Sequence, residues 1–287
     1  MTVITTKRHL GLPLQARHTI EDFQRYILAQ HHAHSPKWLL AQNLIQRIAE
    51  VLVEALDIQG PRVMVEGAAR LLDVNLKFIS AERGRSCGRI EPTDQGFLAV
   101  ISRGSVTDAP LNVRERFTIA HECGHTFFYH MGATGKPRRI IPKSPGGYRE
   151  SRNRESGREE GLCDAFARAL LMPSKWVAKF TVNEPSADNL LSGADYFKVS
   201  TEAFARRVLY DFRGWATSIF FRVDLAGNEL DVHPFLGKRS ESVLSSKKLK
   251  WELAGKQPAD ILHYIQQRFS LRSQDIVRRG SAIWFRL

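Results

Sequence analysis

A five-residue pattern, H-E-x-x-H at positions 121–125, constrains this chain more than any other feature. Residues four apart lie on one face of a helix, so the imidazoles of His121 and His125 can reach the same metal ion. Glu122 projects beside them, where a carboxylate can take a proton from a metal-activated water. The pattern therefore predicts two ligands of a catalytic Zn²⁺ ion, one ion per chain, together with a general base.

The residues around the pattern predict a helix that is anchored in a core. Asn112 and Glu115 form an N-x-x-E capping box at its start. Apolar residues recur at three- and four-residue spacing along one side, at positions 117, 120, 124 and 127. The alternative is a packed helix with two structural histidines, which the spacing alone does not exclude.

A second helix offers the third ligand that a catalytic zinc ion requires. A histidine at the longer H-E-x-x-H-x-x-G-x-x-H spacing is excluded, because that position is Met131. Ser156 and Glu159 form an S-x-x-E capping box, which predicts a helix that starts there and stops at Pro173. Glu160 lies in the first turn of this helix.

The spacing of Glu160 and Asp164 resembles that of zincin metallopeptidases, in which the Glu binds zinc and the Asp hydrogen-bonds a ligand imidazole. We therefore expect Glu160 to be the third ligand and Asp164 to orient a histidine. Asp164 and Glu159 remain alternatives for the third ligand. Each of the three carboxylates could instead bind no metal and simply interact favourably with the dipole at the start of the helix.

The stretches R-F-T-I-A-H-E-C-G-H at 116–125 and E-G-L-C-D-A-F-A-R-A-L-L-M-P at 160–173 resemble the motifs of the ImmA/IrrE family of zinc metallopeptidases. Residues 197–207 resemble a further segment of that family, and the likeness spans about residues 38–212. Cys163 departs from the pattern, which usually has Ala there. The resemblance implies an endopeptidase that cleaves a helix-turn-helix repressor and so derepresses a stress, mobile-element or phage-defence operon.

The expected fold class is α+β, in three parts. Residues 1–37 are expected to be a lead-in with one short helix, and its three histidines a solvated linker. Residues 38–212 are expected to form a zincin-like metallopeptidase domain of helices and a small mixed sheet, including a helical segment at 188–212. Residues 213–287 are expected to form a smaller α/β domain, loosely similar to the GAF-type sensor module of some relatives.

Local patterns predict several elements inside these parts. In the first domain we expect a helix from 38 to 56 and strands at 74–79 and 97–101. The strand at 97–101 is expected to be a sheet edge along which an extended peptide pairs. In the C-terminal domain we expect a helix and three strands; the helix is 258–269, and the strands are 215–223, 229–235 and 281–287.

A formal charge of +12 and a pI near 9.9 favour a polyanionic partner. The segment 132–158 shows no periodicity and is rich in Arg, so we expect a loop that is either a solvated insertion or a substrate- or DNA-sensing flap. Single-stranded DNA is the expected activator. The candidate nucleic-acid contacts are Arg138, Arg139, Arg152, Arg154, Lys247 and Lys248. The last two lie close to Trp251, and the alternative for them is an exposed basic turn.

The cysteines and the absence of long apolar runs favour a cytoplasmic protein without membrane spans. Cys123 is expected to be a core thiol and Cys163 to pack against the first helix. Cys87, in a basic stretch, is either an ordinary thiol or an inhibitory thiol that can occupy the open metal position. Tyr129, His130 and Tyr148 are candidates for stabilising an oxyanion.

A rival hypothesis is a DNA-binding transcriptional regulator that contains zinc but has no protease activity. It rests on the positive charge and on the helix pair at 188–212, which is similar to a helix-turn-helix. Glu122 argues against it, since structural zinc needs no general base.

Overall fold

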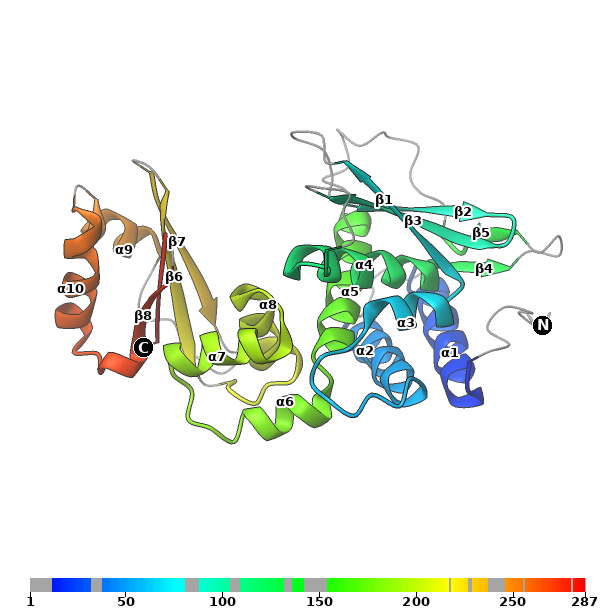
Figure 1. The fold of residues 1–287 in the computed structure, drawn as a ribbon, viewed down its shortest axis with the longest axis horizontal. Helices are drawn as coiled ribbons and strands as arrows, with labels where there is room; N and C mark the ends of the chain where they lie inside the picture. The colour runs from blue at the N-terminus through cyan, green and yellow to red at the C-terminus, as the bar shows by residue number, and fades with distance from the viewer. Residues whose placement is uncertain are drawn as a thin grey trace. The chain divides into compact units, whose positions relative to one another are not determined.

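The structure is a computed structural model in which two compact units, Met1–Pro173 and Ser174–Leu287, divide the chain (Figure 1). It describes residues 12–31, 38–80, 88–103, 109–131, 136–141, 154–216, 218–226, 229–236, 246–254, 256–279 and 281–286. No helix among these residues is long and apolar enough to span a bilayer.

A three-stranded sheet covers one side of the N-terminal unit. Its order is β1 (Val74–Ser80), β3 (Gly96–Arg103), β2 (Gly88–Thr93), with β1 parallel and β2 antiparallel to β3. The strand expected at 97–101 is therefore the central strand, and the expectation that it forms the edge is wrong. The reason is β2, which the sequence did not predict because it begins in a basic, glycine-containing stretch. β2 pairs with the other side of β3 and is joined to it by a two-residue turn.

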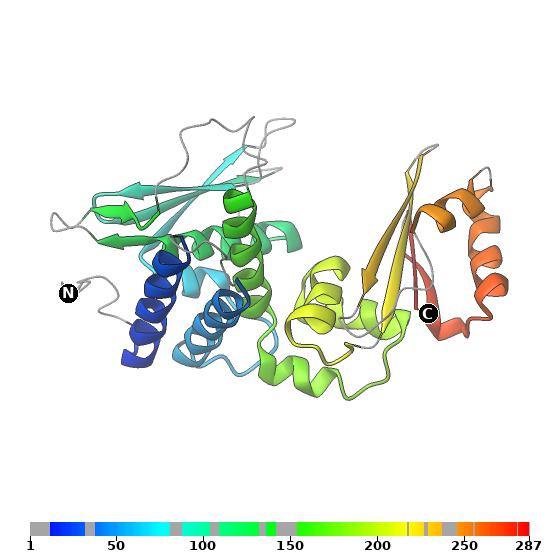
Figure 2. The same ribbon diagram turned by 180° about the vertical axis from the view of Figure 1, so that it is seen from behind.

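The helices of this unit form two layers below the sheet (Figures 1 and 2). α4 (Val113–His125) lies next to the sheet with the short α3 (Val65–Leu71). α1 (Leu14–His31), α2 (Trp38–Ala55) and α5 (Arg154–Leu171) lie on the other side of α4. α1 is longer than the expected helix and is not part of a loose lead-in, because its apolar side chains, such as Phe23 and Ile27, are fully buried.

A short ribbon follows α4. The 3₁₀ turn Thr126–Phe128 leads into β4 (Tyr129–Met131), which pairs with β5 (Pro137–Arg139). Residues 136–141 are thus ordered by strand pairing, in contrast to the loop expected for all of 132–158.

The C-terminal unit is built on an antiparallel sheet with the order β7 (Glu229–Leu236), β6 (Ile219–Ala226), β9 (Ala282–Arg286), β8 (Ile276–Arg279). α9 (Ser246–Leu253) and α10 (Pro258–Phe269) pack on one face around Phe221 and Phe285. Phe220 and Trp284, which strand alternation directs to the opposite face, are also buried, so both faces of this sheet are covered there. The helix expected at 258–269 is confirmed, whereas α9 and β8 were not expected.

The remaining helices of this unit are α6 (Ser174–Phe180), α7 (Ala187–Phe197) and α8 (Thr201–Arg206), followed by the π-helical turn Arg207–Asp211 and, before β8, the 3₁₀ turn Ser273–Asp275. Phe180, Phe204 and Trp215 form one aromatic cluster that includes α6 and α8. The helical segment at 188–212 therefore packs with the C-terminal unit, whereas the sequence had grouped it with the residues before it.

Candidate metal centre

α4 begins as its sequence predicts. The Asn112 side chain accepts a hydrogen bond from the Glu115 backbone N–H, and the Glu115 carboxylate accepts one from the Asn112 N–H, both at 2.9 Å. Arg103 of β3 adds a buried ion pair to Glu115 at 3.1 Å. The capping box is confirmed. The start of the helix is therefore fixed both by local hydrogen bonds and by an ion pair with the central strand.

α5 begins at Arg154, two residues before the expected N-cap, so Ser156 lies inside the helix. The two helices are in close contact at Gly124 and Cys163. A Cβ atom at Gly124 would lie 3.0 Å from the Cys163 Cα and 3.3 Å from its sulfur, so only a glycine fits there without displacement. This contact brings the first turns of α5 beside the histidines of α4.

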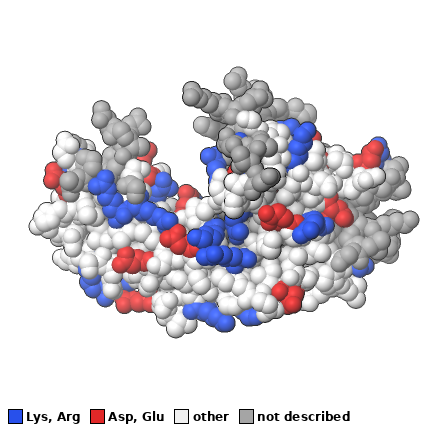
Figure 3. Space-filling view, in the orientation of Figure 1, with Lys and Arg blue, Asp and Glu red and all other residues white. Residues whose placement is uncertain are grey.

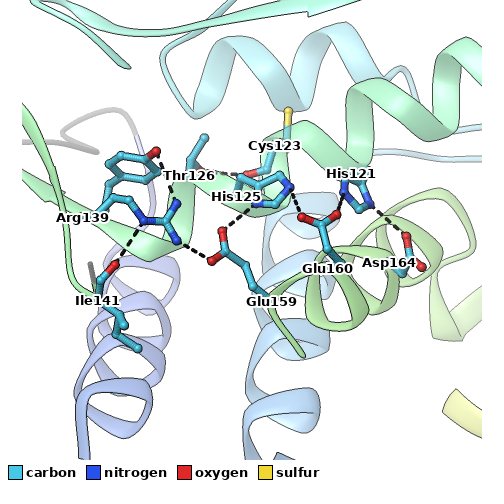
Figure 4. A network of polar contacts seen from close by, with 10 residues as sticks. His121, Cys123, His125, Thr126, Arg139, Ile141, Glu159, Glu160 and Asp164 are labelled. Atoms are coloured by element: carbon cyan, nitrogen blue, oxygen red, sulfur yellow. Dashed lines mark hydrogen bonds and ion pairs between the residues drawn. The ribbon is translucent and has the colours of Figure 1, made fainter. Parts of the chain in front are cut away.

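Glu160 reaches both histidines of the motif (Figure 4). One oxygen lies 3.0 Å from His121 Nε2, and the other lies 3.6 Å from His125 Nε2. Both Nε2 atoms thus point at one carboxylate. Two imidazole nitrogens and a carboxylate are a donor set that zinc binds, so the side chains present fit the ion that the motif implies.

Two further carboxylates of α5 hold the opposite edges of the imidazoles. Asp164 lies 2.9 Å from His121 Nδ1, and Glu159 lies 2.8 Å from His125 Nδ1. A proton held on Nδ1 by a carboxylate leaves the Nε2 lone pair for a metal. Asp164 has the position expected of it. Glu159, considered above as a third ligand, is at Nδ1 instead, because neighbouring residues of a helix point to different parts of the partner helix.

These contacts set the charge of the metal-free site. Burial lowers the pKa of His121, but hydrogen bonds with Asp164 and Glu160 outweigh it and raise the pKa to about 10. The hydrogen bond with His121 lowers the pKa of Glu160. Burial raises the pKa of Glu159, yet hydrogen bonds with His125 and Arg139 lower it to about 2. The site is therefore a compact array of charged groups in which a cation is favoured.

Glu122 is buried, with 6% of its surface exposed, and it lies against the first residue of β2. A Cβ atom at Gly88 would lie 2.9 Å from a carboxylate oxygen of Glu122 and 2.4 Å from the γ-methyl of Thr118. The backbone of β2 therefore passes directly over Glu122 because Gly88 has no side chain. The sequence did not predict that Gly88 allows this close approach to Glu122. The available signal was a single glycine at a strand position.

The two described cysteines differ in their relation to the site. Cys123 is buried and points away from the histidines (Figure 4), and burial raises its thiol pKa to about 12. Cys163 contacts α4 as expected, but its sulfur also belongs to a cluster with ligand nitrogens of His121 and His125, all within 4.8 Å of one another. It is fully buried, and burial raises its pKa. Cys163 is thus a second candidate ligand beside Glu160.

The other expected site residues fall into three groups. Tyr129 is buried, with its hydroxyl 3.4 Å from Arg139 Nη1, on the Glu159 side of the site. His130 lies on β4, opposite Arg138. Cys87 and Tyr148 lie outside the described residues.

The expected nucleic-acid contacts are only partly described. Arg138 is exposed on β5, but Arg139 turns inward to an ion pair with Glu159, which corrects the expectation of a surface contact. Arg152 lies outside the described residues, as do the side chains of Arg154, Lys247 and Lys248. Trp251 is 79% exposed. On the face drawn in Figure 3, basic and acidic side chains are mixed over the described part of each unit.

Two histidines four residues apart on a helix, facing a carboxylate of a neighbouring helix, are an arrangement that can hold a metal ion. Residues 112–209 match the family model of Peptidase M78, the IrrE N-terminal-like domain. This segment is thus similar to a metallopeptidase-family domain, which is consistent with the ImmA/IrrE resemblance of its motifs. The match runs from the cap of α4 into the turn after α8.

Two further comparisons add little. A search of curated proteins gives no significant match. Among solved structures, a Mycobacterium tuberculosis transcriptional regulator aligns with a TM-score of 0.44 and 14% identity, covering 80% of this chain and 75% of that one. Similarity at this level supports no assignment of function.

Proposed function

We propose that this protein is a zinc-dependent endopeptidase whose metal is held by His121, His125 and Glu160. The observation that carries the proposal is the convergence of both Nε2 atoms on the Glu160 carboxylate, at 3.0 and 3.6 Å, while carboxylates hold both Nδ1 atoms. Zinc, when bound, supplies a Lewis acid that activates water and polarises a peptide carbonyl. Three protein ligands leave a coordination position open for this chemistry.

Glu122 is the general base of this proposal. It follows His121 on α4, is not needed as a ligand, and can take a proton from water and deliver it to the leaving nitrogen. Glu122→Gln should keep zinc and fold while cleavage falls on the order of a hundredfold or more. Near-normal turnover in this variant would remove the general-base role. A cellular effect that persists in it with zinc bound would instead favour a DNA-binding regulator without protease activity.

The third ligand can be tested against its competitor. Glu160→Ala should lose zinc and activity together, because two imidazoles alone bind weakly. Cys163→Ser should keep both, because a fully buried thiol is a poor source of thiolate. Substitution of cobalt(II) for zinc reports directly on the ligands, since a thiolate ligand adds a strong near-ultraviolet charge-transfer band. The band is expected to be absent in the wild type; its presence, and its loss in Cys163→Ser, would transfer the ligand role to Cys163.

The substrate is proposed to be an extended protein segment paired with the edge of β2 that faces away from β3. The Phe97 N–H donates to Asp73 beside β1, so Pro92, opposite Phe97, belongs to a pair without hydrogen bonds in the β2–β3 ladder. By strand alternation Ile90 also presents its backbone N–H and C=O away from β3. The backbone nitrogen of Pro92, which carries no hydrogen, therefore faces the outer edge of the sheet, which is the usual position of proline in a strand.

Substrate peptides with N-methyl groups test this pairing. Methylation at alternate residues near the scissile bond should weaken binding, since only alternate N–H groups would contact β2. Equal loss at every position, or at none, would contradict strand pairing.

The physiological substrate is proposed to be a helix-turn-helix repressor, and single-stranded DNA the activator. The support is the ImmA/IrrE resemblance and the charge of +12. The protein should be incubated with the repressor encoded beside it, with and without single-stranded DNA, and fragments identified by mass spectrometry. Stimulation should weaken steeply with salt while basal cleavage of a short peptide persists. Stimulation that is unchanged after neutralising Arg138, Arg152 and Arg154 would exclude their segment as the sensor.

The GAF-like character of the C-terminal part, and a cytoplasmic location that keeps the cysteines reduced, belong to the same proposal. Both rest on the sequence and on the ImmA/IrrE resemblance.

A further inference from the structure

One basic side chain of the β4–β5 ribbon connects to the metal centre. Arg139 is 17% exposed at its side chain and forms an ion pair with Glu159. The other oxygen of Glu159 lies 2.8 Å from His125 Nδ1. A continuous row of contacts therefore runs from β5 through Glu159 to a histidine of the H-E-x-x-H motif (Figure 4).

The guanidinium of Arg139 is fixed on several sides. Its Nε donates to the Ile141 carbonyl at 3.1 Å, and its Nη1 lies 3.4 Å from the Tyr129 hydroxyl. The group also lies 5.2 Å from the centroid of the Tyr129 ring. These contacts leave Nη2 directed at Glu159. The planar guanidinium therefore both holds its own orientation through hydrogen bonds and supplies a positive charge to the Glu159 carboxylate.

The ribbon that carries Arg139 is itself attached to the helical core. Tyr129 and Arg139 are partners in the β4–β5 register, and the Ile140 N–H donates to the Phe128 carbonyl at 2.9 Å. Gln24 of α1 donates to the Tyr129 carbonyl at 2.8 Å. The position of the guanidinium is therefore set by elements other than the two helices that supply the metal-binding residues.

The two histidines differ in how much their carboxylate partners need such support. The Asp164 side chain is 46% exposed, whereas the Glu159 side chain is 14% exposed. A carboxylate that is mostly removed from water requires a paired cation, and a second hydrogen bond restricts its rotation. Arg139 supplies both to Glu159.

We propose that Arg139 is a positioning residue of the metal centre, which fixes Glu159 and through it the ring of His125. The proposal rests on the zinc site proposed above. Residues that orient metal ligands from outside typically change metal affinity by about 10–100-fold when they are removed. Arg139 therefore links the basic segment after α4 to the metal site by a direct chain of contacts, and does not serve as a surface contact for nucleic acid.

The test measures zinc affinity of the full chain by competition with a chelator. Arg139→Ala should weaken zinc binding by about tenfold or more. Arg139→Lys should recover only part of this loss, because an ammonium group keeps the charge without the planar fork. Arg138→Ala is the matched control, since Arg138 is the neighbouring residue of the same strand and is exposed; its zinc affinity should equal that of the wild type.

A double-mutant cycle shows whether Arg139 acts through Glu159. Glu159→Gln should weaken zinc binding, and adding Arg139→Ala to it should cause little further loss. The visible spectrum of the cobalt(II) form should shift in Arg139→Ala and in Glu159→Gln in the same direction, which a loss of ribbon stability alone would not produce.

The outcomes separate this inference from the proposed function. If the wild-type chain binds no zinc, the proposed function fails. If it binds zinc but Arg139→Ala and Arg139→Lys bind equally well, the positioning role is overturned. Fully additive losses in the cycle would also overturn it, since Arg139 would then act independently of Glu159.

Discussion

Replacing Gly88 by Ala should damage the fold and the candidate catalytic base together. The new Cβ would lie 2.4 Å from the Thr118 γ-methyl and 2.9 Å from a carboxylate oxygen of Glu122. Thr118 is β-branched and stiff on its helix, so it cannot turn away at little cost. Overpacking of this kind costs about 1–3 kcal/mol, and we expect the free energy of unfolding to fall by that amount.

The effect on cleavage should be larger than the effect on stability. Relief of the clash needs a movement of β2 or of the Glu122 side chain, and a misplacement of about 1 Å at a catalytic group can cost on the order of a hundredfold in rate. Urea unfolding of the metal-loaded protein measures the first quantity, and cleavage of a peptide substrate measures the second. Gly60→Ala is the control, because a Cβ there meets nothing within 4 Å.

A second substitution separates the two clashes. Thr118→Ser removes the γ-methyl, so Gly88→Ala in that background should cost little further stability, while cleavage stays low because the Glu122 contact remains. Wild-type stability and wild-type cleavage in the single variant Gly88→Ala would refute the reasoning, since β2 would then not be held against α4.

Three further outcomes follow from the same geometry. Zinc affinity should rise with pH, by about tenfold per unit across roughly pH 7–9, because the metal must displace a proton from His121. Burial lowers the pKa of His121, but its carboxylate partners raise it to about 10. A flat pH profile of zinc affinity, measured by chelator competition, would contradict this. The lowered pKa of Glu159 contributes stability that is present above pH 4.5 and is lost as the pH falls through about 2. The free energy of unfolding of the metal-free chain should therefore fall less between these pH values in Glu159→Gln than in the wild type. Gly161→Ala should raise the free energy of unfolding by about 0.5–1 kcal/mol, measured in urea, because that helical position is open and alanine favours the helix; destabilisation would mean that the glycine has another role.

Features that depend on near neighbours in the chain were predictable. The capping box of Asn112 and Glu115 needs only four consecutive residues, and the shared face of His121 and His125 needs only the helical repeat. The helix at 258–269 was predicted with its observed bounds for the same reason.

Features that depend on pairing between distant segments were not predictable from local patterns. β3 became the central strand because Gly88–Thr93 pairs with it, and a stretch with Gly, Arg and Pro gives little strand signal. Arg138 and Arg139 have the same chemistry in sequence. Their opposite directions follow from the β4–β5 register, since successive side chains of a strand point to opposite faces.

The sequence by itself determined that this chain carries two histidines and a carboxylate on one helix, followed by a helix rich in acidic residues. It could not assign Glu159, Glu160 and Asp164 to particular imidazole nitrogens, because all three lie within one turn and a half of α5. That assignment depends on how α5 packs against α4, where the absence of a side chain at Gly124 allows close contact with Cys163. Tertiary packing decided it because helix periodicity fixes directions within one helix, whereas the distance between two helices depends on the side chains at their closest approach.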